Sequence, residues 1–195
     1  MKPKGFTLIE LLVVIAILAV LAVAVVLVLN PAELIKQARD TTRISDLAAL
    51  NSAVAFYLAD YPSASINAGV AAGRCTVGTA PPPGMIQTCT NSTSTEVDGD
   101  GWVLVDFTDI SSGSPLPRLP MDPINAAATS CEGGAVDVCM YVFANDTANH
   151  YEINANMEST KYGGASSGSN VELGTKDGGD DDYWYEVGND PDLNL

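Results

Sequence analysis

The chain contains one histidine, His150, among its 195 residues, and it lacks a Walker phosphate loop. Nucleophilic catalysis needs an activated side chain with a base placed beside it. Neither the composition nor the motifs supply such a pair. We therefore predict that the protein is not an enzyme.

Basic residues are scarce as well. Nine lysines and arginines face 24 acidic residues, and the formal net charge is −15 at pH 7. The electric field of such a negative charge repels nucleic acid and anionic membrane surfaces, and it favours solubility and the binding of cations. A nucleic-acid partner is therefore not expected.

Charge is absent from one long stretch near the N-terminus. Residues 11–29 are nineteen consecutive apolar residues. As a helix they would span roughly 28 Å, about the thickness of a bilayer hydrocarbon core. Lys2 and Lys4 precede this run, and the positive-inside tendency holds such an N-terminus in the cytoplasm. We expect a single membrane-spanning helix, with the rest of the chain outside.

A secretory signal peptide is the alternative interpretation, because Ala22-Val23-Ala24 offers a small-x-small cleavage site. The apolar run is, however, longer than the usual hydrophobic region of a signal peptide, and no polar segment follows the site. Glu10 also argues for a special role, because a carboxylate within an apolar span is costly.

Residues 4–10 read KGFTLIE. This stretch resembles the leader junction of type IV prepilins and pseudopilins. The resemblance implies that prepilin peptidase cuts between Gly5 and Phe6, and that the new amine of Phe6 is methylated. It also implies that Glu10 pairs with the Phe6 amine of a neighbouring subunit and so sets the register of assembly.

The resemblance further implies a homopolymer, an assembly ATPase and a membrane platform as partners. The expected location is the bacterial inner membrane, as a single-pass precursor, and then an extracellular filament. We interpret the chain as a pilus subunit. A type II secretion pseudopilin, or a minor or competence pilin acting in adhesion, secretion or DNA uptake, remains the alternative.

The expected fold is α+β, with a long N-terminal helix packed on a small antiparallel sheet. Its parts are a leader at residues 1–5, a hydrophobic helix at 6–30, an amphipathic helix at 31–61 and a head at 62–195. Asn30-Pro31 should interrupt the helix. Beyond it, apolar residues recur at three- and four-residue steps and predict a stripe that carries the head: Leu47, Leu50, Val54, Tyr57, Leu58 and Tyr61. Lys36, Arg39 and Arg43 should form a solvated basic face, with Glu33 and Asp40 within pairing distance.

In the head, residues 63–101 read as a loop, and residues 102–107 as the first strand, because they are rich in β-formers. Residues 115–123 form a proline-punctuated connection. Alternating patterns predict strands within residues 135–144 and 150–157, joined by a hairpin loop at 145–149.

Four cysteines, Cys75, Cys89, Cys131 and Cys139, follow the apolar run, on the side where disulfides are expected. They form no C-x-x-C pair, which argues against zinc. Of the three possible pairings we favour Cys75 with Cys89 and Cys131 with Cys139, because these close the smallest loops.

The C-terminal region, residues 163–195, is rich in glycine, serine and acidic residues and reads as a loop. Clustered carboxylates in a glycine-rich turn suit calcium, and the region loosely resembles the calcium-binding C-terminal loop of major pseudopilins. The candidate ligands are Asp177, Asp180, Asp181 and Asp182. A solvated acidic loop is the alternative, and no other cofactor is expected.

Overall fold

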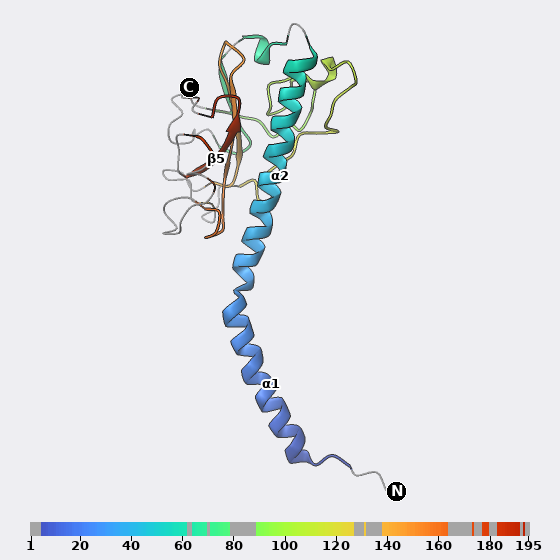
Figure 1. Ribbon diagram of the computed structural model, residues 1–195, viewed down its shortest axis with the longest axis vertical. Coiled ribbons are helices and arrows are strands. Elements are labelled where there is room, and N and C mark those ends of the chain that lie inside the picture. Colours follow the sequence, from blue (N-terminus) through green and yellow to red (C-terminus); the bar gives the residue numbers. More distant parts are fainter. Residues whose placement is uncertain are drawn as a thin grey trace. The chain divides into compact units, whose positions relative to one another are not determined.

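The computed structural model describes residues 5–61, 64–69, 71–78, 89–126, 131, 138–163, 173, 177–179, 183–191 and 193. The chain divides into two compact units, Met1–Ile35 and Lys36–Leu195. The first unit holds helix α1, Leu8–Leu29, and the second holds the sheet and most of helix α2, Pro31–Asp60 (Figure 1).

Helix α1 begins at a capping box. The side chain of Thr7 accepts a hydrogen bond from the backbone N–H of Glu10, and the side chain of Glu10 accepts one from the backbone N–H of Thr7. The helical stretch Leu8–Asp60, which comprises α1 and α2, is long and apolar enough to cross a membrane, with a mean hydropathy of 3.6 in its most apolar part. None of the residues in that part is buried within the structure.

The predicted interruption at Asn30-Pro31 is confirmed. Asn30 adopts a left-handed conformation with φ of 38°, and α2 starts at Pro31. Proline is tolerated at the first position of a helix, where its missing N–H would have no partner in the helix anyway. The break therefore costs α2 no internal hydrogen bond.

The apolar stripe of α2 forms one side of the head's core. Leu47, Leu50, Val54 and Tyr57 are all 3% exposed or less. Leu58 is partly buried against the same core, and Tyr61, at the end of the stripe, is 36% exposed. The stripe predicted from residue spacing thus carries the head through most of its length.

The head contains one five-stranded sheet in the order β2-β1-β3-β4-β5. The strands are β1 Ala72–Cys75, β2 Thr90–Asn91, β3 Tyr141–Asn145, β4 Tyr151–Asn156 and β5 Trp184–Gly188. All neighbouring pairs are antiparallel except β1 with β2, which is parallel. The α+β class is confirmed, and the parallel pair makes the sheet mixed instead of purely antiparallel.

The hairpin of β3 and β4 is the centre of this sheet, as the alternating patterns predicted. Tyr151, Ile153 and Ala155 of β4 join the core that α2 covers. Met140 and Val142 belong to a second cluster that also contains the Cys75–Cys89 pair. The hairpin loop is closed by Asp146, whose carboxylate accepts hydrogen bonds from the N–H groups of Ala148 and His150, each at 2.8 Å.

The predicted strand at residues 102–107 is wrong. Its side chains are buried as expected, with Trp102 and Val103 fully inaccessible, but the backbone bonds to scattered partners. The N–H of Trp102 donates to Ser94 and the carbonyl of Leu104 accepts from Asn67. A short 3₁₀ helix, η2 Phe107–Asp109, ends the segment. The high β-propensity of residues 102–107 therefore reflects the burial of their side chains and not pairing of this segment within the sheet.

Three strands, β1, β2 and β5, lie in regions that we predicted to be loops. Strand β1, with the sequence AGRC, has little β-propensity, and it forms because all four residues pair with β3. Strand β5 follows the acidic run and pairs with β4 along its whole length. A second 3₁₀ helix, η1 Ile66–Gly69, precedes β1. The proline-rich connection at 115–123 contains no helix or strand, as predicted.

Both disulfides join nearest neighbours along the sequence. Cys75 bonds to Cys89 across 14 residues, and Cys131 bonds to Cys139 across eight. This is the pairing that closes the smallest loops, and it leaves no free thiol among the four cysteines.

Replacing Leu50 by alanine should destabilise the head by about 2–5 kcal/mol, because it leaves a cavity at a fully buried position of α2. Urea unfolding of the full chain in detergent, followed by the fluorescence of Trp102 and Trp184, measures this loss. Phe56→Ala on the same helix is the control. Phe56 is 44% exposed, so equal losses in the two variants would contradict the assigned core face.

Candidate functional site

The N-terminal end of α1 carries the residues of the predicted processing site. A Cβ atom at Gly5 would meet no atom within 4 Å. Phe6 is 84% exposed. The chain on both sides of the Gly5–Phe6 bond is therefore sterically open. Cleavage at this bond and methylation of Phe6 stay predictions, since processing leaves no mark on the unprocessed chain.

Glu10 has a partner within its own chain. One of its carboxylate oxygens lies 2.8 Å from the backbone nitrogen and 2.7 Å from the hydroxyl oxygen of Thr7. These bonds hold the carboxylate at the first turn of α1. A threonine followed by glutamate three residues later is the signature of a capping box, and this signal could have identified Thr7 from the sequence. The pairing of Glu10 with an amine of a neighbouring subunit stays a prediction.

The surface of α1 is apolar on all sides. Leu12, Ile15, Leu18 and Leu21, which lie at successive three-residue steps, are each more than half exposed. Residues between them on the other faces are equally apolar, so α1 has no polar face after Glu10. A helix of this kind needs an apolar environment on every side, which either lipid or other helices can provide.

A buried ion-pair network lies where α2 meets the rest of the head. The guanidinium of Arg43 is fully inaccessible, and its Nε lies 2.6 Å from an Asp122 carboxylate oxygen. Its Nη1 lies 2.8 Å from Asp40 and 2.9 Å from Glu158. Arg39 also pairs with Glu158, at 2.6 Å. The prediction of a solvated basic face is therefore wrong for Arg43.

Two carboxylates of the network also accept backbone hydrogen bonds. Asp40 accepts from the N–H groups of Glu158 and Ser159. The carboxylate of Asp122 accepts hydrogen bonds from the N–H groups of Ile124 and Asn125, which follow it in the chain. The network thus ties α2 to the segment that follows β4 and to the proline-punctuated connection. Sequence spacing placed Asp40 within reach of the basic residues of α2, but it did not reveal the two distant carboxylates.

The network shifts the pKa values of its members in opposite senses. Burial alone would raise the pKa of Glu158, but hydrogen bonds from Arg39 and Arg43 outweigh it and lower that pKa. Burial alone would lower the pKa of Arg43, and the hydrogen bonds and charges of Asp122 and Glu158 raise it. Both side chains are therefore held in their charged forms.

Asp46 lies on the same helix and bonds to the sheet. The hydroxyl of Tyr141 donates to its carboxylate at 2.8 Å. Burial raises the pKa of Asp46, although the bond from Tyr141 opposes this shift. Tyr141 keeps its proton, because burial and the charge of Asp46 raise its own pKa.

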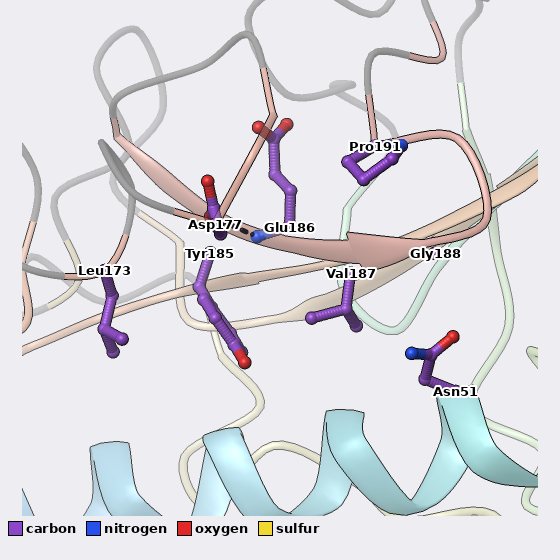
Figure 2. A pocket seen from close by; sticks show the side chains of 8 residues that line it. All are labelled: Asn51, Leu173, Asp177, Tyr185, Glu186, Val187, Gly188 and Pro191. Atoms are coloured by element: carbon purple, nitrogen blue, oxygen red, sulfur yellow. Dashed lines mark hydrogen bonds between the residues drawn. The ribbon is translucent and has the colours of Figure 1, made fainter.

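A pocket of about 360 Å³ lies between the outer part of β5 and α2 (Figure 2). Its lining residues are Asn51, Leu173, Asp177, Tyr185, Glu186, Val187, Gly188 and Pro191. Tyr185 and Val187 point from β5 toward α2, whereas Glu186 points away from the helix. The lining contains no histidine, cysteine or serine, so it offers no nucleophile with a base among the residues that the structure describes.

Asp177 is the one predicted calcium ligand among the described residues. Its carboxylate accepts hydrogen bonds from the N–H groups of Gly179 and Glu186, at 3.2 and 2.8 Å. Burial raises its pKa, and these backbone bonds oppose the shift. Asp180, Asp181 and Asp182 lie outside the described residues. The calcium site stays a prediction, to which the structure adds Glu186 as a neighbouring carboxylate.

One other cluster has metal-ligand atoms close together, in the part of the chain that the structure describes. Cys131, Cys139 and Glu158 lie within 4.8 Å of one another. The two cysteines are joined in a disulfide, and Glu158 is paired with Arg39 and Arg43. This cluster therefore presents no thiolates to a metal.

Comparison with known proteins places one signal on the chain. Residues 1–26 match the family model described as the prokaryotic N-terminal methylation motif. None of the curated proteins and none of the solved structures matches the chain. The match covers Gly5, Phe6 and Glu10 together with most of α1, and it leaves the head without a counterpart in these comparisons.

Replacing Glu158 by glutamine should weaken the head by about 1.5–3 kcal/mol at pH 7, the range for hydrogen bonds to charged groups. The lowered pKa of Glu158 in the folded chain means that its stabilisation is fully present above the ordinary pKa of glutamate, about 4.3. It is lost as the pH falls through the lowered value. Unfolding free energies of both proteins, measured from pH 7 down to pH 3, test this.

The difference between wild type and Glu158→Gln should therefore shrink toward low pH. Glu96→Gln, which changes an exposed acid outside the network, provides the control and should leave the curve unchanged. A difference that stays constant between pH 7 and pH 3 would show that the charge of Glu158 does not stabilise the head.

Proposed function

We propose that this chain, which carries the prepilin-type cleavage and methylation signal of type IV pilins and pseudopilins, is a structural subunit of a type IV pilus. The match of residues 1–26 carries the proposal, and it supports membership in that family. The long apolar helix directly behind the signal fits a membrane-anchored precursor.

Processing is the first step of the proposed function. Prepilin peptidase cuts the bond between Gly5 and Phe6, and the new amine of Phe6 is methylated. The open surroundings of Gly5 and the exposure of Phe6 support access by a protease. Removal of the leader takes away Lys2 and Lys4, while α1 stays on the product.

Polymerisation is the second step. The exposed apolar side chains of α1 leave lipid and pack against copies of the same helix, which replaces one apolar environment by another. Close packing of side chains then supplies the attraction. Glu10 accepts the Phe6 amine of a neighbouring subunit, and two opposite charges attract strongly in such a low-dielectric core.

The remaining parts of the proposal follow from this topology. The head lies outside the inner membrane and then forms the surface of the extracellular filament. Its two disulfides fit this location, because disulfides persist in oxidising environments outside the cytoplasm. An assembly ATPase and a membrane platform supply the work, since the chain shows no nucleotide-binding motif of its own. Adhesion or motility would be a property of the filament.

Imaging of cells for surface fibres, with mass spectrometry of the purified fibres, tests the proposal. We expect to find this chain as the dominant component of long fibres. Fibres without this chain, or no fibres at all under conditions of expression, would instead favour a type II secretion pseudopilin or a minor pilin.

Replacing Gly5 by valine should block processing without disturbing the chain, because a Cβ atom at this position meets nothing within 4 Å. The branched side chain should exclude the backbone from the protease cleft. Mass spectrometry of the N-terminus should find Phe6 methylated in the wild type and the leader retained in the variant. A wild-type N-terminus elsewhere, for instance after Ala24, would refute the proposed cleavage.

Replacing Glu10 by alanine should abolish or strongly reduce fibres, while the precursor still accumulates in the membrane. Thr7→Ala is the matched control, because it removes the capping partner of Glu10 and leaves the carboxylate in place. Loss of the cap should cost only about 1 kcal/mol of helix stability. Fibre yields, measured by shearing and immunoblotting, should fall in Glu10→Ala alone. Equal yields in the two variants would show that Glu10 contributes to assembly only by capping the helix.

A further inference from the structure

A second pocket, of about 350 Å³, lies at the C-terminal end of α2. It is lined by Tyr57, Tyr61, Ser65, Asn67, Gly99, Leu104, Asp106 and Asp109. These residues come from four separate stretches of the chain, and they have no part in processing or polymerisation. The volume of the pocket is within the range of sites for small ligands.

Two aromatic rings form one wall of this pocket. The ring centroids of Tyr57 and Tyr61 lie 5.9 Å apart, with an interplanar angle of 35°. Tyr57 is held from behind by an edge contact with Phe107, at 6.5 Å. Tyr57 is almost fully buried, whereas Tyr61 is 36% exposed and therefore accessible from solvent.

The charge around these rings is negative and lacks a basic neighbour in the pocket lining. One oxygen of Asp106 accepts from the N–H and hydroxyl groups of Thr108, which leaves the other oxygen without a donor among the described residues. None of the described residues donates to the carboxylate of Asp109. Burial raises the pKa of Tyr57, and the charges of Asp109 and Asp106 add to that shift.

The end of α2 adds to this negative potential. The last carbonyls of a helix carry about half an elementary negative charge, which basic residues in the last turn usually balance. The last turn of α2 contains no basic residue and ends in Asp60. The carboxylate of Asp60 is engaged by the N–H and hydroxyl groups of Ser111. Asp106 and Asp109 therefore add charge to an end that is already negative.

The chemistry of the lining favours an organic cation over a hard metal ion. A hard metal ion needs several oxygens that converge within a few ångströms, and the acidic residues of this pocket are not among the groups of described residues that do so. Tyrosine faces attract organic cations, of which guanidinium also donates hydrogen bonds to carboxylates in a planar fork.

We propose that this pocket binds an organic cation, which is a guanidinium or ammonium group. The cation contacts both the aromatic rings of Tyr57 and Tyr61 and the carboxylates of Asp106 and Asp109. The cation is either a free small molecule or the end of an arginine or lysine side chain of another polypeptide. Both sources share the same chemistry at the pocket, and a free and a peptide-borne probe distinguish them.

Titration of the full chain in detergent with argininamide, monitored by calorimetry, tests the proposal. Citrullinamide is the matched ligand control, because it has the same shape with a neutral urea in place of the guanidinium. Argininamide should bind and citrullinamide should not. A blocked Gly-Gly-Arg-Gly-Gly peptide that binds as well as argininamide indicates a protein side chain as the natural cation, and weaker binding of the peptide indicates a free small molecule.

Variants locate the binding within the pocket. Asp109→Asn and Tyr61→Leu should each weaken binding of argininamide by roughly threefold to thirtyfold, the range for loss of an ion contact or an aromatic face. Tyr61→Phe keeps the ring and should retain binding. Asp100→Asn removes the same charge from an exposed residue outside the lining and should have little effect.

Equal binding of argininamide and citrullinamide would overturn the proposal, as would no binding of either arginine probe. Equal weakening by Asp109→Asn and Asp100→Asn would also overturn it, because it would reduce the effect to the general charge of the head. Thermal unfolding of each variant confirms that the head is intact. None of these results depends on whether the chain forms fibres.

Discussion

The head depends on one constraint: α2 must bury a single apolar face against everything that follows it in the chain. Leu47, Leu50 and Val54 are fully inaccessible, and they share a core with the hairpin of β3 and β4 and with the irregular segment around Trp102. A five-stranded sheet with short edge strands would be marginal without such a cover. The sheet, the buried loop and the pocket at the helix end are therefore all positioned by α2.

The buried charges of Arg43, Asp40, Asp122 and Glu158 sit at one edge of this core. Desolvating them costs free energy that ion pairing in a protein interior only just offsets, so the network contributes more to a unique arrangement than to net stability. Because Arg43 contacts Asp122 and Glu158 from two other segments, any other placement of these two segments on α2 would leave a buried charge without its partner. The network thus fixes the register of α2 against the head.

The proposed function divides between the two units of the chain. The first unit holds a processing signal and a helix with no polar side. Such a helix is suited to a lipid environment before assembly and to packing against copies of itself afterwards. The second holds a small acidic domain whose loops are held by two disulfides. Nothing in the head resembles a catalytic site among the described residues, whereas its charge and its aromatic pocket suit the binding of cations.

Sequence alone determined the features that depend on neighbouring residues. These are the apolar helix, the break at Asn30-Pro31, the stripe of α2, the β3–β4 hairpin and the short-range disulfides. Tertiary structure decided the features that depend on distant partners. Strand β1 exists because β3 pairs with it, residues 102–107 stay irregular because their backbone bonds elsewhere, and Arg43 is buried because Asp122 and Glu158 meet it. Local spacing carries no information about such partners, since those of Arg43 lie 79 and 115 residues away in the chain and only folding brings them together.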